Sequence, residues 1–229
     1  MRAPVIITGG SSGIGEAIAR RLRSAGHIVL NLDIVPSLSH PHEHVSCDLN
    51  DPDLIAAAID QIPKKIKGLI CVAGVGELAE TPEKVVRINF LGTRYLTESI
   101  MHNIHPGGAI TLVASSAGRD WINNRQMVEN LLKTNDFSTG NDWLEKNKDA
   151  WQEDAYKFSK QCLAAYTYHA AGQAKNLNLR VNCINPGITE TRLSGNFRDL
   201  IGHENYDRIT RLMGRAGKPE DVAGLAEFL

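Results

Sequence analysis

The chain has 229 residues, of which 42% are hydrophobic and 22% are charged, and its formal net charge is −1. This length suits one large domain or two small ones, and α/β folds of this size are commonly single domains. The near-neutral charge and the lack of basic runs argue against nucleic acid or an anionic membrane as a partner.

The first part of the chain alternates between strand and helix patterns. The short apolar run Val5-Ile6-Ile7 is bounded by a glycine turn and predicts a buried strand. Apolar residues at helical spacing then predict a helix from Ile14 to Ala25, which stops at Gly26. A second strand is expected over Ile28–Leu32, closing on Asp33, and a third over Val45–Leu49.

The same alternation continues to the last predicted strand. Asp51-Pro52 supplies an N-cap and a first-turn proline for a helix ending near Pro63. The elements expected after it are a strand over Leu69–Val72, a long helix from Thr81-Pro82 through Asn89 to about Asn103, a strand over Ala109–Val113, a helix around Tyr156 and a strand over Val181–Ile184. Short connections between alternating elements predict an α/β fold, a doubly wound parallel sheet covered by helices on both faces, as one domain over residues 1–229.

Two regions depart from this alternation. Residues 119–155 carry no strand signal and contain all three tryptophans, Trp121, Trp143 and Trp151. Helix-like pieces are expected there around Met127–Lys133 and Trp143–Lys148, joined by a turn-rich stretch at Asp136–Asn141. We expect this helical insertion to cover a substrate cleft or to dock on a neighbouring subunit, and its aromatic residues either to form an apolar lid or to pack among themselves or at a subunit interface. The second departure is the helical run Glu220–Leu229, which no strand follows.

The N-terminus and the cysteines favour a reducing cytoplasmic setting. Met1-Arg2-Ala3-Pro4 runs straight into a strand and is too short for the apolar region of a signal peptide. No stretch approaches about 18 apolar residues, the length of a membrane-spanning helix. The four cysteines, Cys47, Cys71, Cys162 and Cys183, show no paired spacing, so we expect buried, reduced thiols.

The glycine turn after the first strand predicts a dinucleotide site. Gly9, Gly13 and Gly15 lie between a strand and an amphipathic helix, where glycine lets the backbone approach a pyrophosphate at the helix N-terminus. The spacing is Gly-x3-Gly-x-Gly instead of the standard Gly-x-Gly-x-x-Gly, and a tight turn without a ligand is the alternative.

Asp33 at the end of the second strand predicts the choice of cofactor. A carboxylate there can bind both adenosine ribose hydroxyls and would repel a 2′-phosphate. No arginine or lysine stands at Gly10, Ser11 or Ile34 to receive such a phosphate, so NAD is favoured over NADP. A solvated aspartate at a strand end is the alternative interpretation.

Tyr156 and Lys160 predict proton transfer. Residues i and i+4 lie on the same face of a helix, so the phenol and the ammonium can project into one site. A free phenol has a pKa of about 10, and a nearby lysine favours its phenolate form. Beside a nucleotide-binding turn the pair indicates proton transfer coupled to redox chemistry, although a solvated helix face also gives such pairs by chance.

Taken in order, these motifs resemble the short-chain dehydrogenase/reductase family over nearly the whole chain, from Val5 almost to Leu229. The matching residues are Thr8-Gly9 with Ser11, Ser12, Gly13, Ile14 and Gly15 in the cofactor turn, Asp48-Leu49 at the adenine, Ala73-Gly74 after the fourth strand, Asn89, Ser116, the Tyr156/Lys160 pair, and Pro186-Gly187 with Thr189 at the nicotinamide carboxamide. The resemblance implies a Rossmann-like fold and an NAD cofactor bound by these residues.

The resemblance also implies catalytic roles. Tyr156 would exchange a proton with the substrate oxygen, Ser116 would hydrogen-bond that oxygen, Lys160 would bind the nicotinamide ribose and lower the tyrosine pKa, and Asn89 would support a water-linked proton path. No metal is expected. Three features depart from the family pattern: Cys71-Val72 replaces two asparagines, the segment from Ser116 to Tyr156 is longer than usual, and a final strand is missing, which we expect to lie in an omitted tail.

Together these features predict an NAD-dependent oxidoreductase that interconverts an alcohol and a carbonyl. The insertion resembles those of bacterial 3α-hydroxysteroid dehydrogenase/carbonyl reductases and coniferyl alcohol dehydrogenases, which implies a bulky apolar substrate such as a hydroxysteroid or an aryl alcohol. We expect that small molecule as substrate and a homodimer or homotetramer as the assembly. A non-catalytic NAD-sensing regulator of the same fold is the alternative, although such proteins typically lack the Tyr–Lys pair. Sugar-nucleotide epimerases fit neither the chain length nor the glycine spacing.

Overall fold

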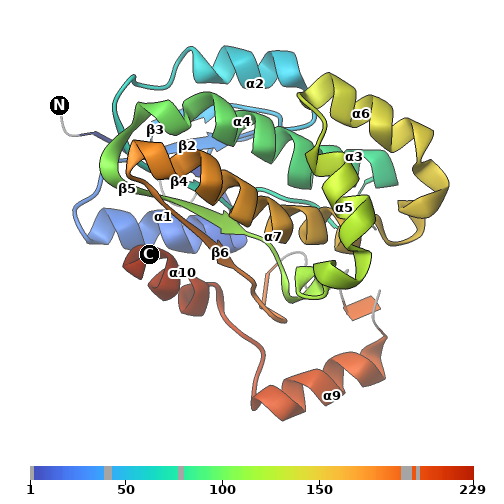
Figure 1. The fold of residues 1–229 in the computed structure, drawn as a ribbon. Helices are drawn as coiled ribbons and strands as arrows, with labels where there is room; N and C mark the ends of the chain where they lie inside the picture. The colour runs from blue at the N-terminus through green and yellow to red at the C-terminus, as the bar shows by residue number, and fades with distance from the viewer. Residues whose placement is uncertain (1–2, 39–42, 77–79, 192–197, 200–201) are drawn as a thin grey trace.

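A single parallel sheet forms the centre of the molecule (Figure 1). The computed structural model describes residues 3–38, 43–76, 80–191, 198–199 and 202–229. Within them the six strands stand in the order β3-β2-β1-β4-β5-β6, and every neighbouring pair is parallel. The strands are β1 (Val5–Thr8), β2 (Val29–Asp33), β3 (Glu43–Ser46), β4 (Ile66–Cys71), β5 (Ile104–Val113) and β6 (Arg180–Ile184). This confirms the predicted α/β fold with a doubly wound parallel sheet.

Helices cover both faces of the sheet, and the alternation of side chains along β1 explains why. Val5 and Ile7 pack with α1 (Gly13–Ser24) and α10 (Pro219–Phe228) on one face. Ile6 points to the other face, into a larger cluster that includes residues of α2 (Pro52–Ile59), α3 (Pro82–Val86), α4 (Thr93–Ile100) and α7 (Ala155–Ala174). Parallel strands that are buried on both faces have continuous apolar sequences, as in the Val5-Ile6-Ile7 run.

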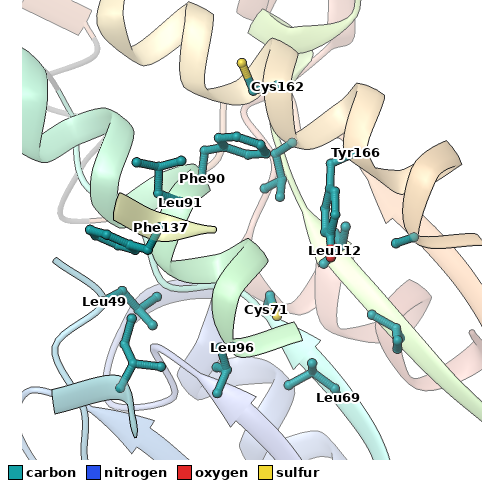
Figure 2. Close-up of a cluster of buried hydrophobic side chains, with 14 of the residues drawn as sticks. Leu49, Leu69, Cys71, Phe90, Leu91, Leu96, Leu112, Phe137, Cys162 and Tyr166 are labelled. Atoms are coloured by element: carbon teal, nitrogen blue, oxygen red, sulfur yellow. The ribbon is translucent and has the colours of Figure 1, made fainter. Parts of the chain in front are cut away.

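The larger cluster also contains buried side chains of the insertion. Figure 2 shows Phe137 and Leu91 among its members, together with the ring pair Phe90 and Tyr166. The planes of these two rings meet at 77° with their centroids 6.1 Å apart, the edge-to-face arrangement that aromatic pairs favour.

The long helix predicted from Thr81 to Asn103 is interrupted. Between α3 and α4 the chain forms a π-helical turn over Arg87–Gly92, which contains Asn89, and the helix ends in a 3-10 turn at Met101–Asn103. Single π turns of this kind often occur at functional sites. The apolar periodicity of the sequence is the same for this turn as for an ordinary α-helix, so the π-helical turn could not be predicted from it.

The insertion is helical, but one prediction about it was wrong. Helix α5 covers Arg125–Leu132 and helix α6 covers Phe137–Lys146, so the stretch Asp136–Asn141 is the start of a helix and is not turn-rich. The side chain of Asp136 accepts a hydrogen bond from the Thr139 N–H, and the Thr139 hydroxyl oxygen accepts one from the Asp136 N–H. This reciprocal pair is a capping box. The polar residues that suggested turns are therefore the ones that begin α6.

Among the described residues, further elements are short turns and the helices α9 and α10 near the C-terminus. The 3-10 turns cover Ser116–Gly118, Trp121–Asn124, Lys148–Ala150, Gln152–Asp154 and Lys175–Leu177. Helix α9 (His203–Met213) lies away from the sheet in Figure 1, whereas α10 packs along α1 with ion pairs from Arg20 to Glu220 and from Arg21 to Glu227. Over the described residues no helix combines the length and apolar character needed to span a membrane.

Candidate active site

A cleft of about 440 Å³ lies at the carboxyl ends of the strands. The strand order reverses between β1 and β4, and such a switch point is where open α/β sheets bind ligands. Most of the predicted site residues line this one cleft: Gly9, Ser12, Gly13, Ile14, Gly15, Asp33, Asp48, Leu49, Ala73, Gly74, Ser116, Tyr156, Lys160, Pro186, Gly187 and Thr189. Ser11 and Asn89 are not among its lining residues.

The glycine turn has the geometry of an anion cradle. Gly9 and Gly13 have φ angles of +71° and +54°, which L side chains rarely adopt. A Cβ on Gly15 would overlap the carbonyl oxygen of Gly9, so the turn closes tightly against the start of α1. Because the first N–H groups of a helix point outward along its axis, this backbone suits a pyrophosphate. These residues fit a dinucleotide cofactor.

Ser11 supports Asp33 from behind the cleft. Its N–H donates to Oδ2 of Asp33 over 3.1 Å, and its hydroxyl donates to the carbonyl of Val35 over 2.6 Å. Asn31, which sequence analysis missed, accepts from the Gly10 N–H over 2.8 Å and donates to the Ser11 hydroxyl over 2.8 Å. The only signal for Asn31 was a polar residue inside an otherwise apolar strand. These bonds fix the Asp33 carboxylate at the end of β2.

Thr8 stabilises the backbone just after β4. Its hydroxyl oxygen accepts hydrogen bonds from the N–H groups of Val72 and Ala73, at 3.0 and 3.1 Å. Cys71 instead packs in the core, with its sulfur 3.6 Å from the Thr97 hydroxyl. The Thr8 side chain therefore anchors the segment after β4 to the end of β1, a contact that the match of Thr8 to the cofactor turn did not predict.

Lys160 is buried beside Tyr156 on α7. The lysine is 5% exposed, its Nζ lies 5.8 Å from the centre of the Tyr156 ring, and it donates a 3.4 Å hydrogen bond to the carbonyl of Val113. Burial lowers the pKa of Lys160 to about 8. The ammonium therefore sits at the cleft in a poorly solvated position, where its charge acts strongly on neighbouring groups.

Two serines line the cleft together with Tyr156, and their contacts differ. The hydroxyl oxygen of Ser115 accepts a hydrogen bond from the Ala117 N–H at 3.2 Å, so it caps its own turn. The Ser116 N–H donates to the carbonyl of Pro186 over 2.8 Å, which joins the serine turn to the Pro186-Gly187 loop. This arrangement favours Ser116 as the serine available to a substrate.

Asn89 lies behind the cleft wall and is fully buried. Its side chain accepts from the Val75 N–H over 2.8 Å and donates to the Val75 carbonyl and to the Ser159 hydroxyl, over 3.0 and 3.1 Å. Gly74 leaves room for it, because a Cβ there would lie 3.0 Å from the Asn89 amide oxygen and 3.4 Å from Lys160 Nζ. Asn89 therefore joins the loop after β4 to the helix that carries Tyr156.

The insertion does not line this cleft, so of the alternatives expected for its tryptophans the apolar lid is wrong. Trp143 and Trp151 stack on Phe158 of α7 with ring centroids 6.2 and 6.1 Å apart. In Figure 1 helix α5 lies beside the end of α7, and α6 lies farther out, near α3. A second hollow of about 330 Å³ lies between the insertion and α7, and Asp120, Lys157 and Gln161 are among the residues around it. Trp143 and Trp151 of the insertion are therefore occupied by packing on α7.

Comparison with known proteins agrees with this geometry. The family model described as short chain dehydrogenase matches residues 3–127, and one described as Enoyl-(Acyl carrier protein) reductase matches residues 144–229. Coniferyl-alcohol dehydrogenase of Pseudomonas sp. (strain HR199 / DSM 7063) is 36% identical over 98% of this chain and 88% of its own. The 3-alpha-hydroxysteroid dehydrogenase/carbonyl reductase of Comamonas testosteroni is 25% identical over the same shares.

A solved structure shows the same fold around a cofactor. The 3-alpha-hydroxysteroid dehydrogenase from Pseudomonas sp. B-0831, complexed with NADH, superposes with a TM-score of 0.82 at 27% identity, covering 99% of this chain and 89% of that one. The family model covers more than half of the chain, and the identity to a full-length relative exceeds a third. The chain belongs to the short-chain dehydrogenase/reductase family of oxidoreductases.

Proposed function

We propose that this protein is an NAD-dependent oxidoreductase that interconverts an alcohol and a carbonyl. The observation that carries the proposal is that Tyr156, Lys160 and Ser116 line the same cleft as the glycine turn. A proton donor and a hydroxyl clamp must converge where charge develops on the substrate oxygen, and a cofactor cradle at the other end of the cleft supplies the partner for redox chemistry.

Three polar side chains of the cleft act in this reaction together with the cofactor. NAD, when bound on the glycine turn, supplies the hydride acceptor. Tyr156 takes the proton of the alcohol at its phenolic oxygen during oxidation and returns it during reduction. Ser116 donates a hydrogen bond to the substrate oxygen and holds it within reach of the phenol. Lys160 carries positive charge beside the phenol and so favours the phenolate.

Asp33 supports NAD over NADP. It lines the cleft at the end of β2, and the hydrogen bond from the Ser11 N–H fixes its carboxylate there. A ribose with two free hydroxyls can donate to this carboxylate, whereas a 2′-phosphate would place negative charge against it.

We propose a bulky apolar substrate, an aryl alcohol such as coniferyl alcohol or a hydroxysteroid. The support is the identity to coniferyl-alcohol dehydrogenase and the likeness to two hydroxysteroid dehydrogenases. Val75 and Ile188 add apolar surface to the cleft that contains Tyr156. The tryptophans of the insertion no longer support this choice, because they pack on α7.

A substrate panel tests the proposal. The protein is mixed with NAD and, in turn, with coniferyl alcohol, benzyl alcohol, a 3α-hydroxysteroid and ethanol, and the formation of NADH is followed by its absorbance. We expect turnover of the aryl alcohol or the steroid at a kcat/KM at least about tenfold above that of ethanol. Tight NADH binding without turnover of any alcohol would instead favour the NAD-sensing alternative.

We also propose a homodimer or homotetramer in a reducing cytoplasm. Ile122 and Tyr168 are 61% and 73% exposed, and Trp121 packs on Tyr168 with ring centroids 5.9 Å apart, so an apolar patch faces outward. All four cysteines are free thiols. Light scattering of the purified protein tests the assembly, and a mass near 25.1 kDa at micromolar concentration would contradict it.

A further inference from the structure

Helix α7 carries a second pair of polar residues next to the catalytic pair. Lys157 directly follows Tyr156, and Gln161 directly follows Lys160. The second pair therefore has the same i, i+4 spacing as the first. One residue turns an α-helix by about 100°, so this second pair lies on the neighbouring side of the helix. There it faces the first residues of the insertion and the second hollow, which lies between the insertion and α7.

Asp120 binds both members of this pair. Its Oδ1 accepts a 3.0 Å hydrogen bond from the Gln161 amide, and its Oδ2 lies 3.3 Å from Lys157 Nζ. Asn124 donates to the other end of the Gln161 amide over 3.0 Å. The hydrogen bond from Gln161 and the charge of Lys157 hold the pKa of Asp120 below its usual range, so the carboxylate is ionised at neutral pH. Gln161 is 4% exposed, and without Asp120 its buried amide would lack an acceptor.

The segment from Ser116 to Asp120 lies directly against α7. It is a compact turn, in which the Arg119 N–H donates to the Ser116 carbonyl over 3.3 Å. A Cβ on Gly118 would overlap the carbonyl of Lys160, so the turn touches the helix backbone at the catalytic lysine. The Ser116 N–H is bonded to Pro186 at one end of this turn, and Asp120 is bonded to α7 at the other.

We propose that Asp120 is a positioning residue, which fixes the turn carrying Ser116 against the helix carrying Tyr156 and Lys160 by bridging Lys157 and Gln161. Asp120 lies outside the cleft lining and touches no reacting atom. The inference rests on the proposed function, because it gives Ser116 the task of holding the substrate oxygen. Without Asp120 the serine hydroxyl would be less well placed relative to the Tyr156 phenol.

A double-mutant cycle tests the proposal. Asp120→Ala should lower kcat about tenfold, since a small misplacement of a positioning group has effects of at least this size, while the KM for NAD stays within about twofold. Asp120→Asn keeps an acceptor for Gln161 and should retain at least about half of kcat. In a Ser116→Ala background the same Asp120→Ala change should alter kcat by less than about twofold, because its effect passes through Ser116. Glu153→Ala removes another carboxylate from the same hollow and should leave kcat unchanged.

Two results would overturn the proposal. One is a full effect of Asp120→Ala in the Ser116→Ala background, which would mean that Asp120 acts elsewhere; the other is no effect on kcat in the otherwise native protein. Hydrogen exchange distinguishes these from failure of the proposed function, since it needs no turnover. Asp120→Ala should speed exchange of the Ala117 and Gly118 amides at least about tenfold, and leave Gly9–Gly15 unchanged. Unchanged exchange at these two amides would exclude the positioning role of Asp120, even in a protein without dehydrogenase activity.

Discussion

Replacement of Lys160 by methionine should stabilise the cofactor-free protein near neutral pH and abolish its turnover. Lys160 is almost fully buried, and burial lowers its pKa from the ordinary value of 10.5 to about 8. Near pH 7 the folded protein therefore holds a charged ammonium that is better solvated in the unfolded chain. Methionine has a similar length and no charge, so it removes this unfavourable contribution to stability.

The magnitude follows from the two pKa values. A fall from 10.5 to about 8 corresponds to about 3 kcal/mol, at about 1.4 kcal/mol for each tenfold change in proton affinity. Methionine also loses the 3.4 Å hydrogen bond from Lys160 to the Val113 carbonyl, worth about 1 kcal/mol. We therefore expect Lys160→Met to raise the free energy of unfolding by about 2 kcal/mol near pH 7.

The sign of the pH dependence is fixed by the direction of the pKa change. Between about 8 and 10.5 the unfolded chain binds more protons at Lys160 than the folded one does, so the stability of the native lysine protein rises with pH in this window. Below it both states are protonated and the full unfavourable contribution remains. The advantage of the methionine variant should therefore shrink to nearly zero by about pH 10.

Urea unfolding of both proteins without cofactor, near pH 7 and again at about pH 10, measures this difference. Lys175→Met, at an exposed lysine near the end of the same helix, is the matched control and should show no such change between the two pH values. A Lys160→Met variant that is less stable than the native protein near pH 7, or whose stability difference is the same at both pH values, would refute the reasoning.

Three further predictions concern the cofactor site and the insertion. NAD should bind at least about tenfold tighter than NADP, and Asp33→Ala should remove most of this preference; equal affinities in the native protein would exclude Asp33 from the ribose site. Gly15→Ala should abolish NADH binding measured by fluorescence, because the new Cβ would overlap the Gly9 carbonyl, whereas Gly172→Ala, where nothing lies within 4 Å, should be neutral or stabilising. Trp151→Ala should lower the free energy of unfolding, measured in urea, by about 3 to 5 kcal/mol and leave the KM for aryl alcohols unchanged. A raised KM with unchanged stability would instead support a lid over the substrate.

The fold was predictable because its signals are local. Val5-Ile6-Ile7 is a short apolar run that ends just before the turn at Gly9, and helix α2 begins at the capping side chain of Asp51. The cofactor turn was predictable for the same reason, since the positive φ angles of Gly9 and Gly13 require glycine. Strand ends were less well placed: the third strand was expected over Val45–Leu49 and lies at Glu43–Ser46.

The missed features depend on contacts between distant residues. Thr8 bonds to the backbone at Val72, and Asn31 bonds to Ser11, and nothing in the local sequence shows either partner. The tryptophans of the insertion were expected either to form a lid near the substrate or to pack among themselves or at a subunit interface, whereas Trp143 and Trp151 stack on Phe158 of α7. Which of two apolar surfaces a side chain covers is decided by tertiary packing, and composition alone does not contain that information.

Tyr156→Phe tests the central claim most directly, because it removes one hydroxyl and keeps the ring. Turnover of the best alcohol with saturating NAD is compared for the native protein, Tyr156→Phe and the control Tyr168→Phe, which changes an exposed tyrosine of the same helix. We expect kcat of Tyr156→Phe to fall at least about 100-fold, with NADH affinity within about threefold of native, since general acid–base catalysis contributes this much. A Tyr156→Phe variant that keeps more than about a tenth of the native kcat would contradict the assignment of proton transfer to Tyr156.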